Sequence, residues 1–195
     1  TSPQVNVGGA TPLAGLTDGK DGRFYGVASG GGTNGVGTIF AFDPVARLFS
    51  VMHNFEDSNG DTPAGAMILG LDTRLYGTTA FGGTTSGGAK STLGTIFSIA
   101  RDGTGFTKLH SFEGPQGANP RGRLLQTNAT TLIGVALDGG RCGQGTIYQY
   151  SSTGATGNGD TGCGQKKSNK GGGTTTPVLL LLLGTLGLAR ARRRR

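Results

Sequence analysis

The hydrophobic residues of this chain recur in a fixed order, as short alternating segments separated by glycine-rich turns. The segment Gly-Thr-Ile-Phe at 37–40 returns at 94–97, and again as Gly-Thr-Ile-Tyr at 145–148. Pro12, Pro63 and Pro120 each stand thirteen residues before Tyr25, Tyr76 and Ile133, and a glycine follows each of these three. The resulting periods of 51 and 57 residues indicate one supersecondary unit used in tandem.

Each repeat predicts four short β-strands bounded by glycine, aspartate and proline turns. The predicted strands of the first copy are 13–17, 23–28, 37–42 and 48–55, and those of the second are 66–71, 74–79, 94–99 and 106–112. The third copy predicts strands at 123–126, 131–136 and 145–148, with no fourth strand after Tyr150. We therefore expect repeat 1 at 12–62, repeat 2 at 63–119 and a partial repeat 3 at 120–150, with residues 1–11 as the tail of a preceding repeat.

Strand alternation predicts sheets that are apolar on both faces. Alternate residues of 38–42 place phenylalanines on one face and Ile39 with Ala41 on the other. The same alternation predicts that Phe49, Val51, His53 and Phe55 share one face of the fourth strand. Such a sheet needs a neighbour on both sides, which the radial blades of a β-propeller provide. The predicted fold is all-β and β-propeller-like, with about two and a half four-stranded blades in this chain.

One connection varies in length between the copies. The glycine-rich link from Tyr25 to Phe40 is fifteen residues long, and the equivalent link from Tyr76 to Phe97 is twenty-one. A change of that size predicts a surface loop, because a buried connection would not accommodate it.

The order of motifs resembles the Gloeobacter and Verrucomicrobia-type tandem repeat, called GloVer. The matching residues are a proline, Leu-Tyr-Gly-Thr-Thr at 75–79, a Gly-Gly loop, Gly-Thr-Ile-Phe at 94–97 and Leu-His-Ser-Phe at 109–112. The resemblance covers about residues 12–150, and the third copy departs from it at Ile133 and after Tyr150. It implies a bacterial surface protein with β-propeller-like domains, and it brings no catalytic residue set.

The C-terminal part has a different composition. Residues 151–173 are rich in Gly, Ser, Thr and Lys and predict a flexible linker. Residues 174–195 predict a short hydrophobic helix with an arginine-rich end, slightly below the roughly 20 residues needed to span a bilayer. The positive-inside bias would keep the arginines cytoplasmic and the repeats outside.

This tail resembles the GlyGly-CTERM sorting signal. The matching residues are Gly171, Gly172 and Gly173, a leucine run, and Arg192, Arg193, Arg194 and Arg195. The resemblance implies export by a Gram-negative cell, a transient transmembrane state in the inner membrane, and cleavage by a rhombosortase, which is an intramembrane protease. The protein would then be secreted or held at the cell surface. An ordinary tail anchor is the alternative.

The overall charge does not describe the repeats. The chain has a net charge of +7, but eight basic residues lie beyond residue 165. Residues 1–165 contain ten basic and eleven acidic residues, which argues against a nucleic-acid partner.

Few residues suggest chemistry. Asp57, Asn59 and Asp61 place oxygen atoms at alternating positions, as calcium loops do, and an ordinary polar turn is the alternative because Thr62 replaces the loop glycine. No other cofactor is expected. His53 and His110 occupy the same repeat position a whole blade apart, so we expect structural roles, because a site needs convergent partners.

The chain has two cysteines, Cys142 and Cys163. In an exported protein they predict a disulfide between the glycine loop of the third repeat and the linker, and otherwise two free thiols.

Together these features predict an exported repeat scaffold that binds a surface glycan or a protein, in addition to the sorting protease. The competing prediction is a fragment of a secreted polysaccharide-active enzyme, which would need a carboxylate pair about 5–10 Å apart. A spacer without a ligand is the third possibility.

Overall fold

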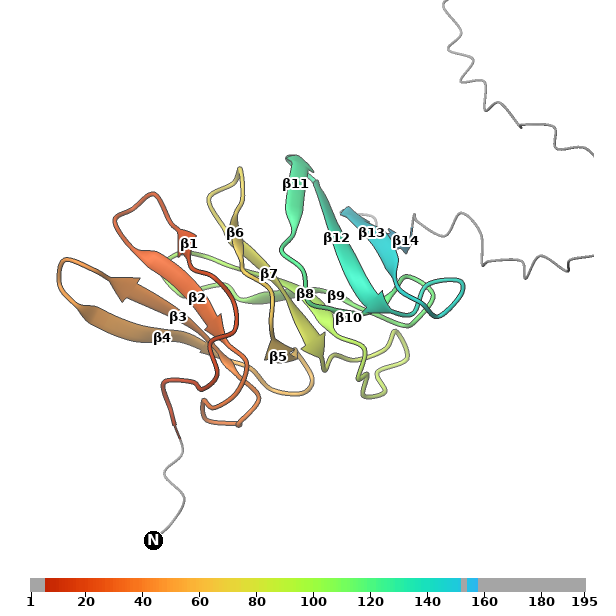
Figure 1. The fold of residues 1–195 in the computed structure, drawn as a ribbon, viewed down its shortest axis with the longest axis horizontal. Coiled ribbons are helices and arrows are strands. Elements are labelled where there is room, and N and C mark those ends of the chain that lie inside the picture. The colour runs from red at the N-terminus through yellow and green to blue at the C-terminus, as the bar shows by residue number, and fades with distance from the viewer. Residues whose placement is uncertain (1–5, 152–153, 158–195) are drawn as a thin grey trace, which may run out of the picture. The chain divides into compact units, whose positions relative to one another are not determined.

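The protein is described by a computed structural model that covers residues 6–151 and 154–157 (Figure 1). Within these residues it contains fourteen β-strands and no helix. The strands form three antiparallel sheets, which we call blades 1, 2 and 3. The predicted all-β, blade-like architecture is confirmed.

Blade 1 contains β1 (Thr17–Asp18), β2 (Phe24–Ala28), β3 (Thr38–Asp43) and β4 (Leu48–Asn54), paired in that order. Blade 2 contains β5 (Asp61–Pro63), β6 (Ile68–Leu69), β7 (Leu75–Phe81), β8 (Thr95–Ile99) and β9 (Thr107–Ser111). Blade 3 contains β10 (Ala118–Pro120), β11 (Leu125–Asn128), β12 (Thr131–Asp138), β13 (Thr146–Ser151) and β14 (Gly154–Gly157).

The third blade is more complete than the sequence predicted. β14 pairs antiparallel with β13, so blade 3 has a fourth strand inside the segment predicted as a linker. The ladder needs only backbone N–H and C=O groups, which glycine, alanine and threonine supply without the aromatic pattern of the other copies. The prediction of two and a half blades was therefore too low for the described residues.

One edge of the sheet in blades 2 and 3 is divided between two short strands. β5 and β6 both pair with β7, and β10 and β11 both pair with β12. The sequence predicted a single strand after the proline, but Pro63 and Pro120 instead end β5 and β10. A proline has no N–H for the ladder, so the chain leaves the sheet there and rejoins it a few residues later.

Residues 6–12 repeat the geometry of the segments that lead into blades 2 and 3. Ala10 bridges Gly30, as Asp61 pairs with Phe81 in blade 2. The backbone of Gly32 donates to the carbonyl of Asn6 at 2.9 Å, and Gly83 donates to Asp57 at 2.6 Å in the same way. This equivalence agrees with the repeat pattern of the sequence.

A β-bulge in the fourth strand corrects the predicted facing of the histidines. Val51 lies opposite Phe40 while His53 lies opposite Ile39, so Val51 and His53 project from opposite faces. The same shift in β9 puts Lys108 opposite Phe97 and His110 opposite Ile96. The extra residue in each bulge reverses the alternation that the sequence pattern assumed.

The hydrophobic core lies between the blades. One cluster joins blades 1 and 2 around Tyr25, Ile39, Phe55 and Phe97, and a second joins blades 2 and 3 around Ile96, Phe112, Leu132 and Tyr148. Blade 2 is covered on both faces, so Phe97 and Ile96 are each fully buried. Each large apolar side chain buried in this way stabilises the fold by about 1.5–3 kcal/mol.

The glycine that follows Tyr25 and Tyr76 makes room for an aromatic ring. A Cβ placed on Gly77 would lie 2.5 Å from Cζ of Phe97, its cross-strand partner. Gly26 meets Phe40, and Gly134 meets Tyr148, in the same arrangement. A side chain at this position would displace the ring, which in the case of Phe97 and Tyr148 lies in the core between blades.

The described part of the chain contains no helix long and apolar enough to cross a bilayer. The predicted hydrophobic segment at 174–195 and nearly all of the predicted linker lie outside the described residues.

Candidate functional site

The long glycine-rich loop of blade 2 has fixed contacts at several points. Thr84 and Lys90 form an antiparallel bridge within the loop. Lys90 makes an ion pair with Asp57, in the link before β5. The hydroxyl of Ser91 donates to the carbonyl of Phe112 at 3.1 Å. These contacts therefore hold the inserted loop in place beside β9.

A hollow of about 420 Å³ lies between this inserted loop and β9. Its lining residues are Thr84, Thr85, Ser86, Lys108, Leu109, His110, Ser111 and Glu113. The lining thus combines hydroxyl groups with one ammonium, one imidazole and one carboxylate. Only the inserted loop pointed to this grouping in the sequence, and neither Lys108 nor Glu113 was predicted as a site residue.

Hydrogen bonds position the two charges of the hollow. Lys108 Nζ donates to the carbonyl of Ser58 at 3.0 Å and to Oγ1 of Thr84 at 2.5 Å. Glu113 Oε1 accepts a hydrogen bond from the backbone N–H of Ser86 at 2.6 Å. That N–H lowers the pKa of Glu113, so the carboxylate is ionised at neutral pH. The hollow therefore presents opposite charges held by backbone groups.

Blade 1 has a related but different hollow, of about 460 Å³. Its lining residues are Asn34, Val36, Glu56, Asp57 and Ser58. By repeat position Glu56 corresponds to Glu113, whereas Val51 stands where blade 2 has Lys108. The lysine and the longer loop are therefore particular to blade 2, among the described blades.

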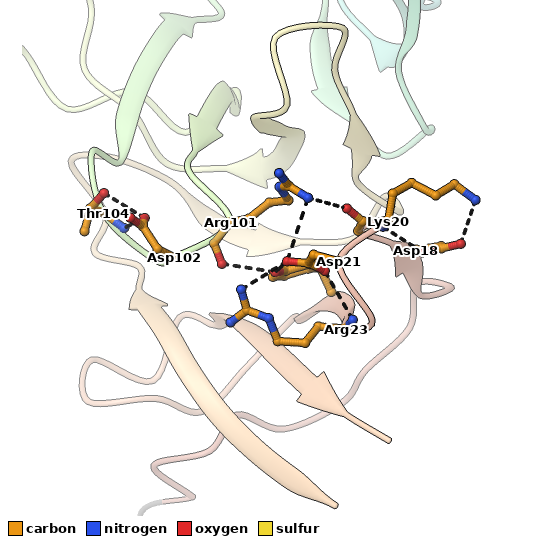
Figure 2. Close-up of polar contacts among 9 residues, drawn as sticks. Asp18, Lys20, Asp21, Arg23, Arg101, Asp102 and Thr104 are labelled. Carbon is orange, nitrogen blue, oxygen red and sulfur yellow. Dashed lines mark hydrogen bonds and ion pairs between the residues drawn. The ribbon is translucent and has the colours of Figure 1, made fainter. Parts of the chain in front are cut away.

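A second polar cluster lies at the opposite ends of the strands, around the turn between β1 and β2 (Figure 2). Asp21 Oδ2 accepts from the hydroxyl of Tyr25 at 2.7 Å and from Arg23 at 3.0 Å. Arg101 of blade 2 donates to the carbonyl of Gly19 at 2.8 Å, and its Nη1 lies 3.9 Å from Asp21. The cluster links blade 1 to blade 2 through the Arg101 side chain.

The electrostatics of this cluster suit a structural contact. Burial raises the pKa of Tyr25, and the bond to the Asp21 carboxylate raises it further, to about 12. Burial also raises the pKa of Asp21, but the hydrogen bonds from Tyr25 and Arg23 outweigh it and the net shift is downward. Both groups keep their ordinary charge states at neutral pH, so neither is prepared for proton transfer.

Blade 2 repeats part of the cluster. The hydroxyl of Tyr76 donates to Asp72 at 2.7 Å, and Arg74 donates to the carbonyl of Gly105 at 2.5 Å. The third copy has Ala129, Thr131 and Ile133 at these positions. Both bonds lie within blade 2, so the part of the arrangement that the two blades share stabilises the turn.

The two histidines lie in different blade interfaces. His53 is stacked on Phe106 and His110 packs against Phe112, with ring centroids 3.7 and 5.1 Å apart. Burial lowers the pKa of both imidazoles. His110 also reaches the hollow of blade 2, whereas His53 does not line it.

The calcium candidates have separate partners. Asp57 pairs with Lys90, Asn59 Oδ1 accepts from the backbone of Glu56 at 3.1 Å, and Asp61 Oδ1 accepts from Thr62 at 2.8 Å. Among the residues that the structure describes, no group of three or more His, Cys, Asp or Glu side chains is arranged to hold a metal ion.

Two further predictions fall on residues beyond the described part. Cys142 is not a free thiol, but Cys163 lies outside the described residues, so the disulfide stays a prediction. The sorting-signal residues 171–173 and 192–195 also lie outside them.

Comparison with known proteins assigns no family to this chain. No protein-family model matches the sequence, and a search of curated proteins gives no match. Among solved structures, the chain is similar to TolB from Acinetobacter baumannii, with 15% identity and a TM-score of 0.47. The similarity covers 75% of this chain and 31% of that one, so this chain spans about a third of the length of TolB.

Proposed function

We propose that this chain is an exported interaction scaffold whose propeller-like blades hold a ligand site formed by the inserted loop of blade 2. The observation that carries the proposal is the hollow beside β9, where the longer loop and Lys108 depart from the blade 1 copy. Binding sites commonly lie on variable loops that a rigid scaffold positions, and one altered loop can therefore give a repeat fold a binding site.

The chemistry of the hollow favours a hydroxyl-rich ligand, such as a surface glycan. Sugar hydroxyls both donate and accept hydrogen bonds, and the lining supplies hydroxyl groups, the Glu113 carboxylate and the Lys108 ammonium. An ammonium has three N–H donors, and Lys108 directs two of its bonds to Ser58 and Thr84. One donor therefore remains for a ligand oxygen.

The competing enzyme function would use two carboxylates on either side of a glycosidic bond. The lining of this hollow supplies one, Glu113. Its lowered pKa also makes it a poor general acid at neutral pH, because a general acid must be protonated. These features support binding rather than hydrolysis at this site.

Export and sorting through the C-terminal segment belong to the same proposal. They rest on the glycine, leucine and arginine pattern of residues 171–195. A ligand site for glycans is useful to a protein that is displayed outside the cell, so the two parts of the proposal are consistent.

A glycan array probed with the full chain tests the binding function. We expect binding to at least one glycan class, reduced at least tenfold in Lys108→Ala and in Glu113→Gln. Lys20→Ala is the matched control, because Lys20 is an exposed lysine in the β1–β2 turn of blade 1, outside the hollow. The same ligands are then incubated with the protein and analysed for cleavage. If the protein cleaves a ligand and Glu113→Gln abolishes the cleavage, the site is hydrolytic and the binding function is wrong. A chain that binds no glycan would also contradict the proposal.

A further inference from the structure

Blade 3 has an open apolar face. Leu125 lies opposite Ile133, and Val135 lies opposite Ile147, so these side chains project from the same side of β11, β12 and β13. Leu125 is 62% exposed, and Val135 and Ile147 are each 52% exposed. Large apolar side chains that are clustered and exposed in this way mark a contact surface.

The same positions are buried in the other two blades. Val27 and Ile39 form the equivalent pair in blade 1, and they are 1% and 0% exposed. In blade 2 the pair is Thr78 and Ile96, which are 1% and 0% exposed. In blades 1 and 2 the next blade along the chain covers this face, whereas in blade 3 the face is open.

Blade 1 is open on its opposite face. Leu16 is 55% exposed and Phe24 is 37% exposed. The residues at these positions in blade 2 are Met67 and Leu75, which are 1% and 0% exposed because blade 1 covers them. The Phe40 and Phe49 rings also lie on this open face, with their centroids 5.0 Å apart.

The open faces of blades 3 and 1 are thus the two halves of an interface that the chain already makes twice. Figure 1 shows blade 2 between the other two blades, and each of its faces is buried by one of them. We propose that blade 3 of one copy of this chain packs on blade 1 of a second copy, in the same head-to-tail manner as consecutive blades. Two copies joined at both ends would bring together the six blades formed by their described residues, within the four to eight that closed propellers contain.

The proposed contact would depend on apolar burial. Arg101, which links blade 2 to the β1–β2 turn, is replaced by Pro44 at the equivalent position of blade 1. The carboxylate that it approaches, Asp21, corresponds to Ala129 in blade 3. Without this polar link, one charge placed on either face should separate the copies.

The test is the mass of the full chain, measured by size-exclusion chromatography with light scattering in a mild detergent. Val135→Asp charges the blade 3 face and Leu16→Asp charges the blade 1 face. Val45→Asp is the matched control, because Val45 is 91% exposed in the turn between β3 and β4. Circular dichroism and thermal unfolding of each variant show that the blades remain folded.

We expect the unaltered chain and Val45→Asp to be dimers at micromolar concentration, and both face variants to be monomers. A mixture of Val135→Asp with Leu16→Asp should recover dimers, because it contains one pair of intact faces. A monomeric unaltered chain would overturn the proposal. A dimer that survives Leu16→Asp but not Val135→Asp would also overturn it, because identical faces would then pair. A dimer that neither charge affects would overturn it as well, because the copies would then associate through the tail.

Discussion

The imidazole ring of His53 lies flat on the ring of Phe106, with centroids 3.7 Å apart and planes inclined by 7°. His53 belongs to β4 of blade 1 and Phe106 precedes β9 of blade 2, so the stack joins two blades. Phe55 meets both rings edge-on, at 5.2 and 5.8 Å. The β-bulge in β4 makes this contact possible, because it turns His53 toward the next blade.

The stack predicts that acid weakens the fold in the range where histidine titrates. Burial lowers the pKa of His53 and of His110, although Glu56 and Glu113 respectively oppose the shift. The unfolded chain therefore binds more protons, so stability is full above the unfolded pKa of about 6.5 and falls as the pH drops below it. Urea unfolding at pH 7.5 and 5.5 should show a lower midpoint at pH 5.5.

The double variant His53→Phe, His110→Phe is the control for that effect. It should remove most of the difference between pH 7.5 and 5.5. The carboxylates with lowered pKa, such as Glu113, lose their stabilising contacts only at lower pH, below about 4. A difference that persists unchanged in the double variant would show that other groups cause it.

A methyl group at Gly77 should destabilise the central blade. The new Cβ would lie 2.5 Å from Phe97 Cζ and 3.1 Å from Met67 Cγ. Overpacking of this kind typically costs about 1–3 kcal/mol. The free energy of unfolding of Gly77→Ala measures it, and Gly15→Ala is the control, because nothing lies within 4 Å of a Cβ there. Equal stability of the two variants would contradict the close ring contact.

Removing the guanidinium of Arg101 should weaken the contact between blades 1 and 2. Its bond to the Gly19 carbonyl and its approach to Asp21 are partly shielded from water. A charged hydrogen bond contributes about 1.5–3 kcal/mol, whereas water screens the exposed ion pair of Lys20 with Asp18, which should contribute little to stability. Chemical denaturation should therefore show a larger loss for Arg101→Ala than for Lys20→Ala, and the reverse order would refute the link.

Tyr148→Phe should stabilise the protein. The Tyr148 hydroxyl is buried and has no hydrogen-bond partner among the described residues, and burial raises its pKa. Phe40 and Phe97 occupy the same position in the other repeats. Removing an unpaired buried hydroxyl should raise the free energy of unfolding by about 1–3 kcal/mol. Tyr150→Phe serves as comparison, because Tyr150 is only half-buried, and a loss of stability in Tyr148→Phe would point to an unrecognised partner.

The sorting proposal predicts a defined C-terminus. In a Gram-negative host that contains a rhombosortase, the mature protein should end near residues 171–173, and intact-mass measurement would show loss of the leucine and arginine segment. Replacing Gly171, Gly172 and Gly173 by leucine should prevent cleavage and leave the full chain in the membrane fraction. Uncleaved unaltered protein in that host would favour the simple tail anchor.

The sequence by itself determined the repeat, the strand class and the need for a neighbour on both faces of each sheet. These follow from local properties: the spacing of glycines and prolines sets the turns, and two-residue alternation sets which side chains share a face. That logic failed where a contact depended on another strand. The sequence pattern did not indicate the bulges that separate His53 from Val51. β14 pairs with β13 through backbone atoms, so the residue pattern of 154–157 did not indicate a strand.

The candidate site was decided almost entirely by the tertiary structure. Thr84 lies in the inserted loop, more than twenty residues before Lys108 and Glu113, and only the packing of that loop against β9 brings the three side chains to one hollow. Likewise, Val27 and Val135 are the same residue at the same repeat position, yet one is 1% and the other 52% exposed. Local sequence sets the chemistry of such a face, and the presence of an adjacent blade determines whether that face is buried.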